Sequence, residues 1–185
     1  MLNVISGLLG AGTPVSTNSY ESIMTANGTG SSGVITFTSI PSTYKHLQIR
    51  WLAKNTSTGS YNLLRFNSDS GSNYADHYVY GQGSNPALAG ADTTQTSINL
   101  YGSLIGSSPA DIYAAHIVDI LDYTSANKNK TVRAFGGQDN NGAGVIFLSS
   151  GLWMNSSTAI SSLTITANTG NFTTASQFAL YGIKG

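Results

Sequence analysis

The side chains that could carry acid–base or metal chemistry are few and scattered along this chain. The three histidines are His46, His77 and His116, and none is close in sequence to another. Asp76 directly precedes His77, and adjacent residues point to opposite faces of an extended strand. Asp119 follows His116 by three positions, which also places the two on opposite faces. We therefore interpret the histidines as structural or surface residues, and we expect no metal site and no catalytic residue.

Other enzyme chemistries are disfavoured by what the chain lacks. Cysteine is absent, and Glu21 is the only glutamate. Hydrolysis of glycosidic bonds uses a pair of positioned carboxyl groups, which one glutamate and scattered aspartates do not readily supply. Residues 28–33 match a dinucleotide-binding pattern by letters, but a β-type run follows them where that motif opens a helix. We therefore expect a protein that is not an enzyme and that uses no cofactor.

Two turns, residues 67–73 and 139–142, are rich in oxygen-bearing side chains. Calcium sites use about six to eight oxygens, commonly from several carboxylates, whereas each of these turns contains a single aspartate. We interpret both segments as solvated turns rather than as cation sites.

The tyrosines offer a different kind of chemistry. Tyr74, Tyr78 and Tyr80 alternate with other residues, so they share one face of a strand. Aromatic faces stack on sugar rings, but the same amphipathic side chains also form layers between sheets or between subunits. We keep both interpretations of this face, a glycan-binding surface and an inter-sheet or inter-subunit aromatic layer, and we favour the second.

The composition indicates one soluble domain with a sizeable core. The chain has 185 residues, of which 40% are hydrophobic and only 9% are charged, and its formal net charge is zero. Nucleic acids and anionic membranes attract clusters of Lys and Arg, so a charge-poor surface argues against both as partners. No apolar run approaches the roughly 20 residues that a transmembrane helix requires.

Residues 1–19 form an apolar arm that contains several glycines. Glycine makes a short helix marginal in isolation, so we expect an arm that is extended or briefly helical. We expect this arm to dock on a neighbouring subunit; the alternative is that it folds back on its own domain. The candidate partner-binding residues are Leu2, Val4, Ile5, Leu8 and Leu9.

Residues 20–185 show a repeated pattern of strands and turns. In residues 44–52, Leu47, Ile49 and Trp51 alternate with polar side chains, which predicts a half-buried antiparallel strand. We expect one all-β domain, an antiparallel, jelly-roll-like β-sandwich of two four-stranded sheets. The expected strands cover residues 34–38, 44–52, 61–66, 74–82, 94–101, 112–121, 131–135, 145–153, 159–166 and 177–184.

Four stretches also carry a family resemblance. They are residues 19–23, 39–50, 65–74 and 178–184, and the likeness extends over most of residues 19–185. The chain resembles a group of small structural proteins of tailed bacteriophages, especially those of aquatic hosts such as cyanobacteria. The shared motifs are strand and turn patterns, and none is a catalytic signature.

This resemblance implies a virion β-sandwich that binds other proteins. We expect a capsid cement, or decoration, protein that binds the outer capsid surface as a trimer and stabilises the shell. Its partners would be the major capsid protein and further copies of itself, with no nucleic acid and no membrane. The alternative is a tail-fibre or receptor-binding module that recognises host surface polysaccharide.

Overall fold

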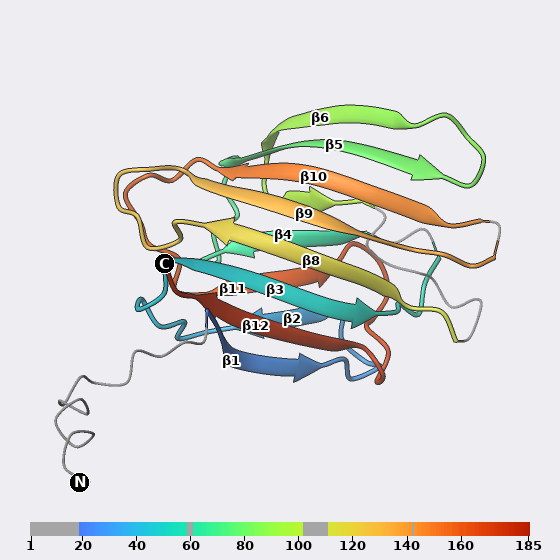
Figure 1. Ribbon diagram of the computed structural model, residues 1–185, viewed down its shortest axis with the longest axis horizontal. Coiled ribbons are helices and arrows are strands. Elements are labelled where there is room, and N and C mark those ends of the chain that lie inside the picture. Colours follow the sequence, from blue (N-terminus) through green and yellow to red (C-terminus); the bar gives the residue numbers. More distant parts are fainter. Residues whose placement is uncertain (1–18, 59–60, 102–110, 142) are drawn as a thin grey trace, which may run out of the picture.

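The chain folds into two antiparallel β-sheets packed face to face, as seen in a computed structural model that describes residues 19–58, 61–101, 111–141 and 143–185 (Figure 1). The described part of the chain contains strands and no helix. The strands are β1 (Tyr20–Asn27), β2 (Val34–Phe37), β3 (His46–Ala53), β4 (Asn62–Phe66), β5 (Tyr74–Gln82), β6 (Leu88–Gln95), β7 (Ile98–Leu100), β8 (Ala114–Leu121), β9 (Lys130–Gln138), β10 (Val145–Trp153), β11 (Leu163–Ala167) and β12 (Gln177–Ile183).

The two sheets are unequal in size. The large sheet has eight strands in the order β1-β12-β3-β8-β9-β10-β5-β6, and the small sheet has four in the order β2-β11-β4-β7. In Figure 1 the large sheet lies in front of the small one. The predicted all-β antiparallel sandwich is confirmed, but the prediction of two four-stranded sheets is wrong. The sequence marks where strands occur, whereas their distribution between sheets depends on long-range pairing.

The same limit explains one misplaced strand. Residues 94–101 were expected to form a single strand, but β6 ends at Gln95 and β7 begins at Ile98 in the other sheet. The chain crosses between the sheets at Thr96, whose carbonyl accepts a hydrogen bond of 2.9 Å from Nε of Arg65. Residues 1–18 of the expected arm lie outside the described residues, so the arm and its boundary stay a prediction.

Both edges of the large sheet are irregular. In β1 the pairing with β12 shifts between Ser22 and Met24. In β6 two residues, Thr93 and Thr94, oppose the single Ala75 of β5, because Tyr74 pairs with Gln95 while Asp76 pairs with Asp92. These shifts are β-bulges, which twist a strand and interrupt its regular row of backbone groups.

Side chains that alternate along the strands fill the space between the sheets. Leu47, Ile49 and Trp51 of β3 are buried, as their spacing predicts; Arg50 and Leu52 are exposed, whereas Gln48 is buried as well. The bulkiest fully buried residues form the centre of this core: Trp153, Tyr74, Tyr123, Phe37, Phe66, Phe147, Phe172 and Phe178.

The oxygen-rich turn after β4 is closed by its own aspartate. The indole Nε1 of Trp153 donates a 2.8 Å hydrogen bond to Oδ2 of Asp69, and the backbone N–H of Gly71 donates one of 2.9 Å to Oδ1. The side-chain amide of Asn73 donates to both carboxylate oxygens. These bonds, that of Trp153 first, lower the pKa of Asp69. The carboxylate therefore joins this turn to the core.

Replacing Asp69 tests this connection. Asp69→Ala leaves the indole N–H of buried Trp153 without its acceptor, and an unsatisfied buried donor costs roughly 1–3 kcal/mol. We expect the free energy of unfolding, measured by urea denaturation, to fall by about that amount. Asp139→Ala, in an exposed turn, is the matched control and should change it by about 0.5 kcal/mol or less. Equal losses for the two variants would contradict the proposed role of Asp69.

Candidate functional site

The face of the large sheet that points away from the small sheet carries an exposed apolar surface. Six large side chains of β3, β5, β8, β9 and β10 point outward there, each between 41% and 58% exposed. Antiparallel sheets with one solvated face normally alternate apolar-in with polar-out, so an outward apolar cluster is informative. We call it the apolar patch; it consists of Leu52, Val79, Ile117, Phe135, Ile146 and Leu148.

Strand register makes the apolar patch continuous. Ile117 of β8 pairs with Phe135 of β9, which pairs with Leu148 of β10, and Leu148 pairs with Val79 of β5. Directly paired residues on one sheet face have neighbouring Cβ atoms, so these four side chains form one row across four strands. Ile146 lies two residues from Leu148 on the same face of β10.

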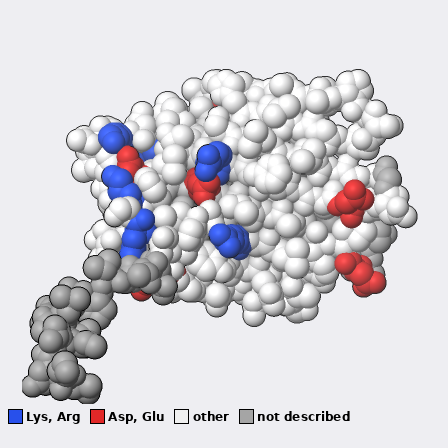
Figure 2. All heavy atoms as spheres, in the orientation of Figure 1, with Lys and Arg blue, Asp and Glu red and all other residues white. Residues whose placement is uncertain are grey.

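A polar row borders the apolar patch. Asp119 of β8 accepts a 2.7 Å hydrogen bond from Nε2 of Gln48 and forms an ion pair of 2.7 Å with Nη2 of Arg133. Nε of Arg50 donates to Oε1 of Gln48, and its guanidinium lies 5.3 Å from the ring centre of Tyr181. The charges on this part of the face are therefore engaged with one another. In Figure 2, which has the orientation of Figure 1, small charged clusters are separated by wide uncharged surface.

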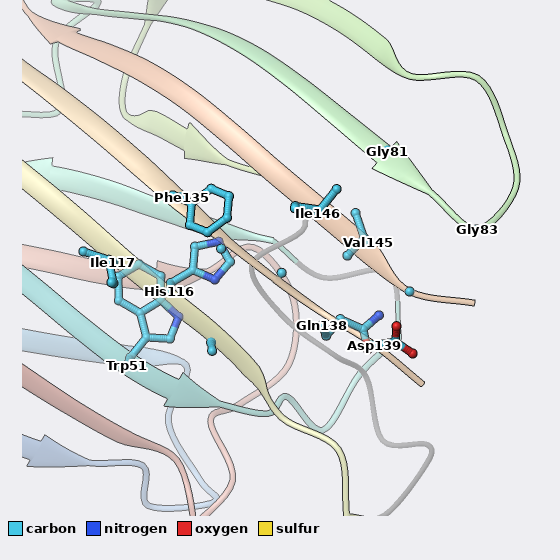
Figure 3. Close-up of a pocket in the computed structure, with 14 residues that line it drawn as sticks. Trp51, Gly81, Gly83, His116, Ile117, Phe135, Gln138, Asp139, Val145 and Ile146 are labelled. Atoms are coloured by element: carbon cyan, nitrogen blue, oxygen red, sulfur yellow. The ribbon is translucent and has the colours of Figure 1, made fainter. Parts of the chain in front are cut away.

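One end of the apolar patch is hollowed into a cavity of about 690 Å³ (Figure 3). Outward-pointing Ile117, Phe135 and Ile146 belong to its lining, so it opens on the outer face. Five glycines also line it, which leaves room where side chains would otherwise stand. The lining is completed by Trp51, Ala115, His116, Gln138, Asp139, Val145 and the glycines at 81, 83, 136, 137 and 144.

His116 is held by packing. Its ring stacks on Trp51 with ring centres 5.0 Å apart, and it lies 6.0 Å from Phe147. A Cβ at Gly136 would come within 2.3 Å of this ring, so the glycine makes room for it. Neither ring nitrogen has a hydrogen-bond partner among the described residues. Burial lowers the pKa of His116 to about 3, so the imidazole is neutral at physiological pH.

The other histidines lie apart from His116. Nδ1 of His46 accepts a 2.9 Å hydrogen bond from the backbone N–H of Asp122, and His77 is exposed on β5. Among the described residues, no group of three or more potential metal ligands comes together.

The predicted tyrosine face is divided by the structure. Tyr74 is fully buried, its hydroxyl donates to the carbonyl of Asp69, and burial raises its pKa to about 12. Tyr74 therefore lies in an inter-sheet aromatic layer, one of the interpretations kept above, and its ring is not available to a glycan or to another subunit. Tyr78 and Tyr80 are partly buried and packed against the core, and whether they bind glycan or a subunit stays a prediction.

Tyr78 and Tyr80 belong to a larger cluster that the sequence did not reveal. The ring of Tyr78 lies 4.5 Å from that of Tyr101 and 6.1 Å from that of Tyr80, and Tyr61 lies 4.9 Å from Tyr101. We call these four residues the tyrosine cluster. The hydroxyl of Tyr101 donates a 2.9 Å hydrogen bond to Oδ2 of Asp92.

A buried carboxyl group lies beside this cluster. Asp76 is 1% exposed, and its Oδ2 accepts a 3.0 Å hydrogen bond from the backbone N–H of Asn99. Its Oδ1 has no partner in the described part of the chain. Burial, opposed by that hydrogen bond and reinforced by the charge of Asp92, raises the pKa of Asp76 to about 6. Asp76 and Asp92 meet only because β5 pairs with β6. The spacing of the two aspartates in the sequence does not reveal this.

The five arm residues that were expected to bind a partner lie outside the described residues. Within the described residues, no helix has the length and apolar character needed to cross a membrane. Comparisons of this chain with protein-family models, with curated proteins and with solved structures find no match.

Asp76 and His116 predict opposite effects of pH on stability. The folded-state pKa of Asp76, about 6, exceeds its ordinary 3.8, so the folded state binds more protons and Asp76 lowers stability as pH rises from about 4 to 6. The folded-state pKa of His116, about 3, is below its ordinary 6.5, so His116 lowers stability as pH falls from about 6.5. Between pH 4 and 6 the two effects oppose each other.

Asp76→Asn should remove the contribution of Asp76 to the pH dependence of stability. We expect the variant to gain stability relative to the native chain as pH rises from 4 to 6, by up to about 1.4 kcal/mol per pH unit, and to keep that gain above pH 7. Urea denaturation at several pH values measures it. Asp139→Asn, on an exposed turn, is the control that makes the same chemical change outside the core. A pH-independent difference for Asp76→Asn would refute the assignment.

Proposed function

We propose that this chain is a virion structural protein of a tailed bacteriophage, a capsid cement protein that works by adhesion and not by catalysis. The apolar patch is the observation that supports the adhesive role, because an outward apolar surface on a charge-poor sheet is suited to burial against another protein. The resemblance of residues 19–185 to phage structural proteins supports the place in a virion. The outer capsid surface, a trimeric state and the major capsid protein as partner are parts of this proposal.

The physical properties of the patch fit such a role. Each of its large side chains gains roughly 1.5–3 kcal/mol when it passes from full exposure to full burial, so partial burial of six of them yields a useful fraction of that sum. An uncharged contact is also little affected by salt. A protein that binds only the assembled shell stabilises that state by mass action, and many copies act together.

A second function is favoured by the tyrosine cluster. Its four partly exposed rings lie beside the carboxylate of Asp92, and aromatic rings with neighbouring hydrogen-bonding groups are suited to a sugar ligand. This would make the chain a receptor-binding module for host polysaccharide. A glycan array probed with the purified protein separates the two proposals: specific binding that is lost in Tyr78→Ala favours the second.

The adhesive role can be tested on the part of the apolar patch that lies outside the cavity. Leu148 and Val79 are paired and outward-pointing, so the double variant Leu148→Asn/Val79→Asn places two amides in the proposed contact. We expect at least about a tenfold loss of affinity for purified capsids, which corresponds to about 1.4 kcal/mol or more. Co-sedimentation with capsids that lack the protein measures it.

The control is Val34→Asn. Val34 is 47% exposed but belongs to the small sheet, so this variant changes the same kind of residue away from the patch. Both variants should keep the native melting temperature, because all three side chains are exposed. Unchanged capsid binding by the double variant, or an equal loss for the control, would rule out the outer face of the large sheet as the adhesive surface.

A further inference from the structure

The cavity at the end of the apolar patch has the properties of an apolar binding groove. Its volume of about 690 Å³ lies within the range of roughly 300–1,000 Å³ typical of ligand pockets. Ile117, Phe135 and Ile146 give it apolar walls. Asp139 is the one charged residue in its lining, so the cavity is suited mainly to an uncharged, apolar ligand.

Three residues of this lining also carry buried polar atoms without partners in the described part of the chain, although these atoms are not exposed to the cavity. Nε1 of Trp51 is a buried donor, and Oε1 of Gln138 is a buried acceptor, and neither has a hydrogen-bond partner among the described residues. Trp51 is 4% exposed and His116, with its two unpaired ring nitrogens, is 3% exposed. Figure 3 shows the rings of Trp51 and His116 together at one end of the lining. Because these atoms are shielded from solvent, the surface that the cavity offers to a ligand is mainly apolar.

The chain itself contains a segment of matching chemistry. Residues 2–9 hold five large apolar side chains, no charge and one glycine. A segment rich in large apolar side chains is what the apolar walls of the cavity are suited to bury. We propose that the cavity binds residues 2–9 of a neighbouring copy of this chain. The proposal deepens the adhesive function proposed above and rests on it.

The position of Ser19 favours a neighbouring copy as the source of the bound residues 2–9. Ser19 accepts a hydrogen bond from Lys184 beside β1, and β1 is four strand spacings, about 19 Å, from β9. Along the strand direction, the cavity lies at the level of Leu52 of β3, which pairs with Ala115. Ser19 lies near the other end of β3, about six residues or about 20 Å away. The straight-line distance from Ser19 to the cavity of the same chain is therefore about 28 Å.

The ten residues from Leu9 to Ser19 span at most about 36 Å when fully extended. For the arm to reach the cavity of its own chain, this glycine-containing stretch would have to extend to roughly three quarters of its maximum length. The arm of an adjacent copy is under no such constraint. Because each copy then donates one segment and offers one cavity, the copies either exchange segments in pairs or form a head-to-tail ring.

Cross-linking in the full-length chain tests the proposal. A photoreactive p-benzoylphenylalanine replaces Leu9, unlabelled and ¹⁵N-labelled chains are mixed, and the cross-linked peptides are identified by mass spectrometry. We expect cross-links that join differently labelled chains and that map to β8, β9 or β10. Cross-links confined to one chain, cross-links that map elsewhere, or none at all would overturn the proposal.

A blocking variant makes the test specific. A Cβ at Gly81 would meet only Cγ2 of Ile146, at an ordinary 3.6 Å, so Gly81→Leu adds a side chain to the cavity lining without a backbone clash. We expect it to lower the yield of inter-chain cross-links at least about tenfold. Ala89→Leu is the control. Ala89 lies on β6, where it pairs with Val79 of β5, and it is outside the cavity lining. An unchanged yield for Gly81→Leu would also contradict the proposal.

The two proposals can fail separately. Capsid binding is tested with Leu148→Asn/Val79→Asn, neither of which lines the cavity. If that binding is lost as expected while the cross-links avoid the cavity, the adhesive function stands and the arm site is wrong. If capsids are not bound at all but the cross-links map to the cavity, the chain assembles with itself in the proposed way and its partner is not a capsid.

Discussion

The packing of an eight-stranded sheet against a four-stranded one determines most of what this protein presents to its surroundings. The alternating side chains of the large sheet have one face toward the core, where Trp51, Phe147 and Phe178 are buried. The opposite face of the same strands meets no other part of the described chain and holds the apolar patch. The inward tyrosines at the β5 side pack against one another and against the rim of the core. The apolar patch and the tyrosine cluster therefore both follow from the way the small sheet covers only one face of the large sheet.

The sequence predicts local features of this architecture well. The alternation in residues 44–52 correctly assigns Leu47, Ile49 and Trp51 to the core, and the spacing of His116 and Asp119 correctly separates them onto opposite faces. Pairing between distant strands is not encoded in such spacing, so the sheet sizes and the division of residues 94–101 were missed. Tyr74 shows the same limit, because a period of two residues does not say which strand face the other sheet covers.

The apolar patch illustrates what a sequence can signal only weakly. Its members come from five strands and become one surface only through the register of β3, β8, β9, β10 and β5. The single local sign is that residues 112–121 are apolar on both faces of the strand, where a solvated face would carry polar residues. The cavity is harder still to foresee, since it depends on which glycines stand side by side across strands.

The bulges in β1 and β6 restrict how copies of this protein can meet. An unprotected edge strand is a template on which another chain can add a strand, and repeated addition produces fibrils. Both edges of the large sheet are interrupted, by the shift at Ser22 and Met24 and by the extra residue of β6 at Thr94, whose φ is +55°. Lateral polymerisation through backbone ladders is thereby discouraged. Contacts that the large sheet makes with other copies therefore depend on side chains, which are more selective than backbone ladders.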